Sequence, residues 1–336
     1  MAANLSKKNR PVFIYLHLTS RCNLRCKYCY ANVDGRFSDP KVRDFGTEEW
    51  KKLIEDSFTL GARYFHLYGG EPLVREDIGE LVDFCKKKGG FVEIMTNGHL
   101  IGARIREIEN VDSICLSLDG DETTNDAIRG VGTFCAVREA VRVCKKHKIP
   151  VRIHAVVNQF NLADPGYLPR LAQEWGVTVS YSQPHVFTYI EDDSIQLTDE
   201  QIRTFWKKMR GMKRQGYPID NTVKALDYVI RWPISYQHVI KTKEEAAKLS
   251  KAKGFEFMRC GMGRTAVVID SQGSLLPCLN FGMFSDANFH KAGFHKAYEL
   301  LCKRQCFACA NLQFVEVNLA MRLSPRSVLK GIAYHL

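Results

Sequence analysis

The stretch VFIYLHLTSRCNLRCKYCY, residues 12–30, joins an apolar run directly to three closely spaced cysteines. The pattern of residues 12–18 predicts a β-strand. Cys22, Cys26 and Cys29 follow it, with three and then two residues between them. A closed zinc site takes four ligands, as do most iron–sulfur clusters. Three thiolates on a four-iron cluster leave one iron open to a small molecule, which makes the missing fourth ligand informative.

Strand-like and helical patterns alternate along the chain after this stretch. Further strand-like segments cover residues 64–68, 91–96, 113–118, 151–157 and 177–182. Helical patterns between them include residues 47–60, 76–88 and 133–147. Such alternation is typical of a parallel sheet with right-handed crossovers. The sequence therefore predicts an α/β fold built as a partial, six-stranded (β/α) barrel of the TIM type.

The predicted strands carry apolar side chains on one face and polar ones on the other, since successive strand residues point to opposite faces. In the first strand, Ile14 and Leu16 alternate with Tyr15 and His17. Polar residues recur at alternate positions of other strands, at His66, Glu93, Cys115, Ser117, Arg152 and His154. A parallel strand covered on both sides reads as almost continuously apolar. The pattern therefore predicts a polar, ligand-holding cavity, with hydrogen bonding inside the core as the alternative for any single member.

The composition is that of a globular protein with an excess of basic residues. The 336-residue chain is 45% hydrophobic and 25% charged, with a formal net charge of +11. It has no apolar signal-peptide segment before Pro11 and no run long enough to span a bilayer, so we expect a cytoplasmic protein. In that compartment twelve cysteines indicate metal or redox chemistry before disulfides. Aromatic residues are not interleaved with the basic runs, which argues against a nucleic-acid partner.

Four further motifs strengthen the interpretation of the three-cysteine loop, for which a zinc knuckle is the alternative. Tyr28 precedes the last cysteine, and the ends of the next predicted strands carry YGGEPL (68–73), MTNG (95–98) and SLDG (117–120), followed by NDAIRG (125–130). Together these segments resemble the radical S-adenosylmethionine (SAM) superfamily over residues 11 to 190. The resemblance implies that Cys22, Cys26 and Cys29 hold a [4Fe-4S] cluster to which SAM binds.

The resemblance also implies how SAM is bound and used. The expected cofactor-binding residues are Tyr28, Gly69, Gly70, Glu71, Asn97, Ser117, Arg129 and Asn158. Glu71 offers an acceptor for the SAM ammonium group, and Arg129 a partner for its carboxylate. A reductant such as flavodoxin or ferredoxin supplies the electron that cleaves SAM to methionine and a 5′-deoxyadenosyl radical. That radical removes hydrogen from the substrate, so no side-chain general base is expected to be essential.

A second cysteine group lies near the C-terminal end. Residues 265–278 read as a β-hairpin that delivers Cys260 and Cys278, and Cys306 and Cys309 form a second pair. This arrangement resembles the twitch form of the SPASM extension, which implies one auxiliary [4Fe-4S] cluster on these four cysteines. A structural zinc site is the rival interpretation. Cys302 is surplus to both; it is a candidate hydrogen donor in catalysis or an unreactive thiol.

These patterns divide the chain into four regions. They are the barrel (11–190), a lysine-rich helical linker (191–255), the twitch-like region (256–315) and a C-terminal amphipathic helix (316–336). Val328, Leu329, Ile332 and Leu336 share one side of that helix, and Arg322, Arg326 and Lys330 make it basic. We expect it to dock on the barrel, with peripheral contact to a membrane surface or an anionic substrate as the alternative.

The substrate is the least determined part of the interpretation. Only the first eleven residues precede the first predicted strand, so we expect no separate peptide-recognition domain. We therefore expect a small biosynthetic molecule, such as a sugar, nucleotide or lipid precursor. The first alternative is maturation of a ribosomally synthesised peptide by epimerisation or cross-linking. The second is a protein of another class, a zinc-binding nucleic-acid-binding protein.

Overall fold

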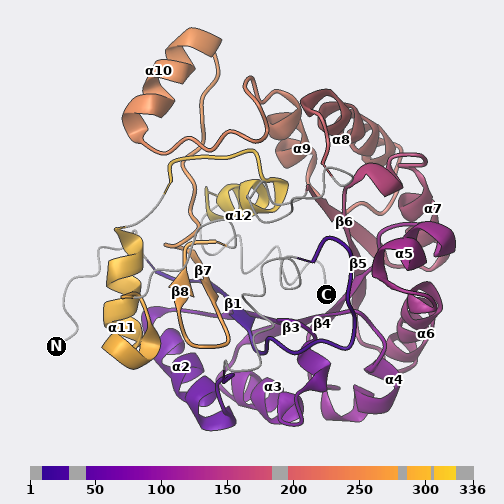
Figure 1. Cartoon of the computed structure of the whole chain (residues 1–336), viewed down its shortest axis with the longest axis vertical. Helices are drawn as coiled ribbons and strands as arrows, with labels where there is room; N and C mark the ends of the chain where they lie inside the picture. Colours follow the sequence, from indigo (N-terminus) through magenta and orange to yellow (C-terminus); the bar gives the residue numbers. More distant parts are fainter. Residues whose placement is uncertain (1–9, 30–42, 184–195, 279–285, 304–305, 323–336) are drawn as a thin grey trace.

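A single curved sheet organises the molecule, with helices packed around its outside (Figure 1). The computed structural model describes residues 10–29, 43–183, 196–278, 286–303 and 306–322. The strand order is β6-β5-β4-β3-β2-β1-β7-β8, in which β8 is antiparallel to β7 and all other neighbouring pairs are parallel. The strands are β1 (Phe13–His17), β2 (Tyr64–Tyr68), β3 (Phe91–Thr96), β4 (Ser113–Ser117), β5 (Val151–Val156), β6 (Thr178–Ser182), β7 (Ala266–Ile269) and β8 (Leu275–Leu276). The predicted partial barrel and all six of its strands are confirmed, and two more strands extend the sheet.

The helices follow the strands as the crossover rule requires. They are α2 (Thr47–Leu60), α3 (Ile78–Lys87), α4 (Ile101–Arg104), α5 (Glu122–Arg129), α6 (Thr133–Lys146), α7 (Tyr167–Glu174), α8 (Asp199–Arg214), α9 (Val223–Ile230), α10 (Lys243–Lys253), α11 (Phe289–Cys302) and α12 (Leu312–Arg322). Short 3-10 turns are η1 (Pro72–Val74), η2 (Ile105–Glu107) and η3 (Gln159–Asn161). None of the helices within the described ranges combines the length and apolar character that a membrane span requires.

Helix α2 shows why the local sequence fixes these boundaries. The Glu49 carboxylate accepts a hydrogen bond of 2.7 Å from the backbone N–H of Gly46, which precedes the helix. Gly61 ends the helix in the left-handed conformation with φ of +110°. That conformation is strained for residues with a β-carbon, so glycine is favoured there. The predicted range of 47–60 is confirmed.

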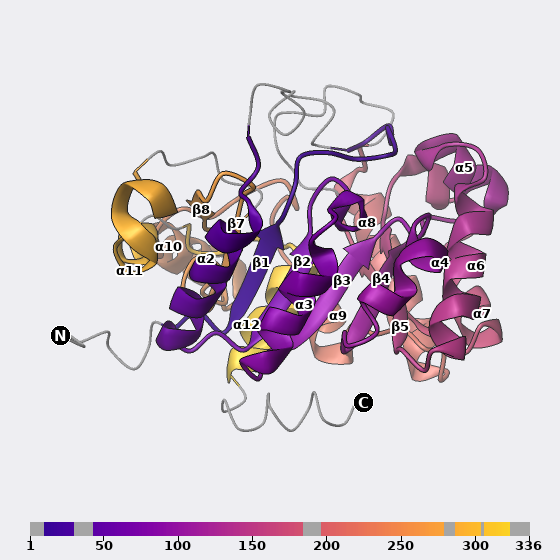
Figure 2. The ribbon, with the colours of Figure 1, turned by 90° about the horizontal axis from the view of Figure 1, so that it is seen from below.

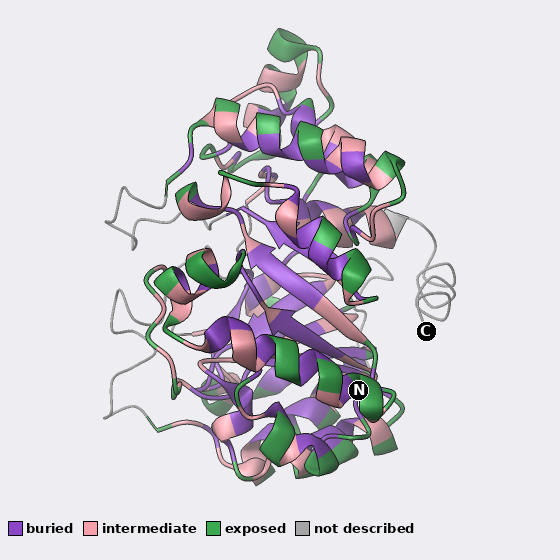
Figure 3. Cartoon of the chain, turned by 90° about the vertical axis from the view of Figure 1, so that its right-hand side faces the viewer, coloured by how far each residue is buried: buried purple, intermediate pink, exposed green. Residues whose placement is uncertain are grey.

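The two faces of the sheet differ as the strand alternation predicts. Apolar side chains such as Ile14, Phe65 and Ile114 are fully buried against the outer helices, whose outward surfaces are exposed (Figure 3). On the other face the polar side chains contact one another. The Glu93 carboxylate pairs with both Arg152, at 2.7 Å from Nε, and His66, at 3.0 Å from Nδ1. The polar face is therefore a connected network.

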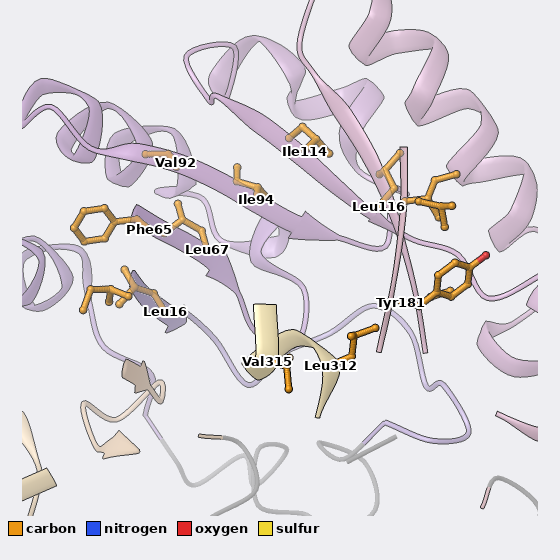
Figure 4. Packing of buried hydrophobic residues seen from close by; sticks show 14 of the residues in the cluster. Leu16, Phe65, Leu67, Val92, Ile94, Ile114, Leu116, Tyr181, Leu312 and Val315 are labelled. Atoms are coloured by element: carbon orange, nitrogen blue, oxygen red, sulfur yellow. The ribbon is translucent and has the colours of Figure 1, made fainter. Parts of the chain in front are cut away.

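The C-terminal region is continuous with the barrel sheet. The predicted hairpin is confirmed as β7 and β8, and β7 pairs directly with β1. Helix α12 begins at Leu312, four residues before the predicted C-terminal helix, and lies over the polar face, where Gln313 Nε2 is 3.2 Å from His154 Nε2. Leu312 and Val315 belong to the same buried cluster as the strand residues in Figure 4. Residues 316–322 of the predicted C-terminal helix (316–336) belong to α12, and the rest of that predicted range lies outside the described residues.

Candidate active site

The three-cysteine loop leaves the carboxyl end of β1, where ligands gather in parallel barrels (Figure 2). The backbone N–H of Leu18 donates to the Tyr68 carbonyl at 2.7 Å, which continues the pairing of β1 with β2 up to the start of the loop. Cys22, Cys26 and Cys29 are all partly buried. The loop therefore starts from a fixed point on the sheet.

The Gly69-Gly70 turn after β2 lies directly against this loop. The N–H of Gly70 donates to the Thr19 carbonyl at 2.7 Å, and that of Glu71 to the Arg21 carbonyl at 2.9 Å. A β-carbon placed on Gly70 would lie 2.2 Å from the Arg21 carbonyl oxygen, and one on Gly69 would lie 2.7 Å from that of Thr19. Both glycines are therefore required for the close approach of the two backbones.

Glu71 is almost fully buried, and its carboxylate binds to the protein itself. Oε1 accepts hydrogen bonds from Leu73 N at 3.0 Å and Thr96 Oγ1 at 2.8 Å, and Oε2 accepts one from Asn97 N at 2.9 Å. Burial raises the pKa of this carboxyl to about 7, although the three donors favour its ionised form. Glu71, the residue expected to accept a hydrogen bond from the SAM ammonium group, thus connects the turn after β2 to the end of β3.

Asn97 extends this connection to the three-cysteine loop. Its Nδ2 donates to Asn23 Oδ1 at 2.7 Å, and Asn23 directly follows Cys22. Ser117, the last residue of β4, is partly buried and pairs in register with His154 of β5. The structure thus brings Asn97 to the loop, as the sequence suggested, and places Ser117 at the strand end.

Tyr28, Asp119 and Arg129 form one hydrogen-bonded group across three segments. The Tyr28 hydroxyl donates to Asp119 Oδ2, and Arg129 donates from Nε to the same oxygen at 2.6 Å and from Nη2 to the Tyr28 oxygen at 2.7 Å. Asp119 Oδ1 also accepts from Val156 N at 3.0 Å. Sequence reasoning missed Asp119, although the SLDG segment contains it. Arg129 therefore already pairs with a carboxylate of the protein.

Asn158 binds mainly within its own turn. Its Oδ1 accepts from Phe160 N at 2.9 Å, and its Nδ2 donates to the Val156 carbonyl at 2.9 Å. The residue is fully buried and caps η3. Both polar atoms of the side chain thus have partners at the end of β5 or in the turn that follows it, which is the local structural role that the sequence pattern also allowed.

The loop cysteines interact electrostatically with one another. Burial raises the pKa of Cys26 to about 11, Arg129 opposes that rise, and thiolates at Cys29 and Cys22 add to it. In the described ranges, no three His, Cys, Asp or Glu side chains lie close enough to share a single metal ion. A four-iron cluster does not require that closeness because each thiolate binds a different iron. The loop therefore fits such a cluster by its donor set and its place at the strand ends.

The structure also brings together the four cysteines expected at an auxiliary cluster. Cys260 and Cys278 are buried in one apolar cluster, which Cys309 packs against. Burial raises the pKa of Cys309 well above its ordinary value, and charges on Cys260, Cys306 and Cys278 contribute to that rise. Cys302 is the last residue of α11, and its Sγ lies 3.6 Å from the Gly263 carbonyl oxygen.

The polar face beneath these two cysteine groups holds further functional candidates. Arg152 Nη1 donates to Ser180 Oγ at 2.8 Å, and His154 lies 2.9 Å from the same hydroxyl. Tyr15 stacks on His66 with ring centroids 4.5 Å apart. Charged, aromatic and hydroxyl groups thus form a wall that can orient a polar substrate.

A family model and curated relatives both match this chain. The profile described as Radical SAM superfamily matches residues 16–166. The chain is 33% identical to the mycofactocin maturase MftC of Mycolicibacterium smegmatis over 319 residues, which cover 90% of this chain and 75% of that protein. It is 29% identical to the Fe-coproporphyrin III synthase of Methanosarcina barkeri over 273 residues, which cover 78% of this chain. The match spans only 65% of that synthase, just under two thirds of its length.

A solved structure shares the fold. Native anSMEcpe with bound AdoMet and the Kp18Cys peptide aligns with a TM-score of 0.63 at 17% identity, covering 91% of this chain and 83% of that one. At this identity the likeness shows a shared architecture.

Proposed function

We propose that this chain, which belongs to the radical SAM superfamily, is a maturase of a ribosomally synthesised peptide. Members of this superfamily are enzymes that bind SAM and a [4Fe-4S] cluster, so the zinc-binding nucleic-acid-binding alternative is set aside. The observation that carries the peptide proposal is the 33% identity to a mycofactocin maturase over 90% of the chain. The small-molecule substrate expected from the sequence has less support among the relatives.

Two sets of cysteines would hold the iron–sulfur groups. Cys22, Cys26 and Cys29 would hold the cluster that binds SAM, and Cys260, Cys278, Cys306 and Cys309 would hold the auxiliary cluster. When bound, these groups supply the one-electron cleavage of SAM that no protein side chain performs. The chain's own residues hold the loop in place through the Gly69-Gly70 contact and the group formed by Tyr28, Asp119 and Arg129.

The polar face would bind and orient the peptide. Arg152 and His154 on β5 and His66 on β2 offer donors and acceptors there, and Tyr15 offers an aromatic surface. Tyr68 and Phe314 lie in the apolar cluster that includes Cys260 and Cys278, and Met95 packs against it. A substrate between these groups would meet polar and apolar surfaces together, as an amphipathic peptide segment requires.

The relative named Fe-coproporphyrin III synthase, whose name gives an iron porphyrin as its product, favours a second candidate, a tetrapyrrole substrate. Anaerobically reconstituted protein with SAM and dithionite separates the two candidates. The probes are a short peptide encoded beside the gene and an iron porphyrin, with products followed by mass spectrometry. The proposal expects a SAM-dependent mass change in the peptide together with formation of 5′-deoxyadenosine. Conversion of the porphyrin with an unchanged peptide would overturn it.

A further inference from the structure

The segment before α10 is fixed to the auxiliary cysteine pair by backbone hydrogen bonds. Ile240 N donates to the Ala308 carbonyl at 2.9 Å, and Phe307 N donates to the Ile240 carbonyl at 2.8 Å. Ala308 lies between Cys306 and Cys309 in the chain. Residues 240–253 therefore extend outward from the place where two of the proposed auxiliary ligands sit.

This segment and its neighbour expose a set of basic side chains, which we call the lysine surface. Helix α10 buries only Ala246 and lies at the edge of the molecule, away from the sheet (Figure 1). Among the described residues, no member of the lysine surface has an ion-pair partner. Three acidic residues share the segment: Glu245 binds His238 and the Lys241 N–H, and Glu244 and Glu256 are exposed, so the six basic residues exceed the acidic ones by three. The members are Lys241, Lys243, Lys248, Lys251, Lys253 and Arg259, all exposed.

Tyr68 connects the auxiliary cysteines to the three-cysteine loop. It packs in one buried cluster with Cys260 and Cys278. Its carbonyl accepts from Leu18 N at 2.7 Å, and the Gly69-Gly70 turn that follows it bonds to the backbone of Thr19. The two cysteine groups are thus joined through packed side chains and short hydrogen bonds.

We propose that an acidic one-electron carrier protein, of the flavin or iron–sulfur type, docks on the lysine surface. The inference rests on the proposed auxiliary cluster. When bound at the two cysteine groups, the iron–sulfur clusters would pass one electron from the reduced carrier to SAM, whose sulfur–carbon bond would break to give methionine and the 5′-deoxyadenosyl radical. Opposite charges on the two proteins bring the carrier to the side where the auxiliary cysteines lie.

A charge-reversal variant tests the docking site on the reconstituted holoenzyme. The test variant is Lys243→Glu with Lys248→Glu and Lys251→Glu. The matched control is Lys146→Glu with Lys207→Glu and Lys208→Glu, which makes the same charge change at exposed lysines of α6 and α8. Fluorescence anisotropy measures the Kd of labelled flavodoxin at low and at high salt, and dithionite-driven formation of 5′-deoxyadenosine is measured in parallel.

The proposal expects the test variant to weaken flavodoxin binding about tenfold at low salt and less at high salt, because salt screens exposed charges. The control stays within about twofold of the wild type, and dithionite-driven activity is unchanged in both variants. Equal Kd shifts in test and control, or no shift in either, would overturn the docking site. Loss of affinity for the peptide substrate alone would assign the surface to that substrate instead. A wild type that is inactive with dithionite would count against the proposed function, independently of the binding result.

Discussion

The Glu71→Gln variant tests whether the Glu71 carboxylate stabilises the site through hydrogen bonds to the protein or binds a ligand directly. At about pH 8, above its pKa of about 7, the ionised carboxylate accepts hydrogen bonds from Leu73, Thr96 and Asn97. Glutamine keeps one acceptor oxygen, which can serve Leu73 and Thr96. Its NH₂ group then faces the Asn97 N–H, so one buried donor loses its partner. That loss costs about 1–3 kcal/mol of unfolding free energy.

Urea unfolding of the reconstituted protein at about pH 8 measures the effect as a shift of the midpoint. The matched control is Glu76→Gln, since Glu76 is exposed and lies five residues along the same loop. The control should stay within about 0.5 kcal/mol of the wild type. Hydrogen exchange at the Asn97 amide should also become faster in the Glu71 variant, because that amide is the one left without an acceptor. An unchanged midpoint combined with strongly weakened SAM binding would refute this reasoning and show that the carboxylate serves the ligand directly.

Four further changes follow from the same structure. Burial lowers the pKa of His17 from 6.5 to about 4, so between those pH values the unfolded chain binds a proton that the folded chain does not. When the pH falls from about 7 to about 5, the wild type should therefore lose about 2 kcal/mol more unfolding free energy than His17→Gln does. Equal losses in the two proteins would contradict this. Gly70→Ala places a β-carbon 2.2 Å from the Arg21 carbonyl, so iron content and SAM affinity should both fall, whereas unchanged values would show that the loop adjusts freely. Glu93→Gln breaks the buried pair with Arg152 and should cost about 3–5 kcal/mol in urea unfolding, while a cost below about 1 kcal/mol would mean that the pair is well solvated. Reconstituted wild type should bind about eight irons and Cys26→Ala about four, and a wild type that stays at about four would count against the auxiliary cluster.

The strands and their faces could be predicted because the signal is local. Alternation at His66 and Tyr68, or at Arg152 and His154, depends only on the pleat of one strand. The helix ending at Gly61 was equally predictable, because the left-handed residue stands in the sequence itself. The pairing of β7 with β1 could not be predicted in this way, because it joins segments about 250 residues apart and the local pattern of a strand does not indicate which strand it pairs with.

The site was predictable in its residue types and less so in their partners. The sequence predicted Glu71 and Arg129 as cofactor-binding residues. It could not show that Glu71 already accepts a hydrogen bond from Thr96 and that Arg129 already pairs with Asp119, because those contacts join different strand ends. Asp119 resembles an ordinary turn residue until the fold brings Tyr28 to it. The first turn of helix α12 was missed because its pattern is weakly amphipathic and its buried residues meet different surfaces, the barrel core at Leu312 and the cysteine cluster at Phe314.

The most direct test of the account is the electron paramagnetic resonance spectrum of the reduced, reconstituted protein with and without SAM. Because an iron held by only three cysteines is open to SAM, one component of the wild-type spectrum should change when SAM is added. The same component should be missing from Cys26→Ala. A wild-type spectrum that SAM leaves unchanged, or a SAM-sensitive signal that persists in the variant, would contradict the assignment of Cys22, Cys26 and Cys29.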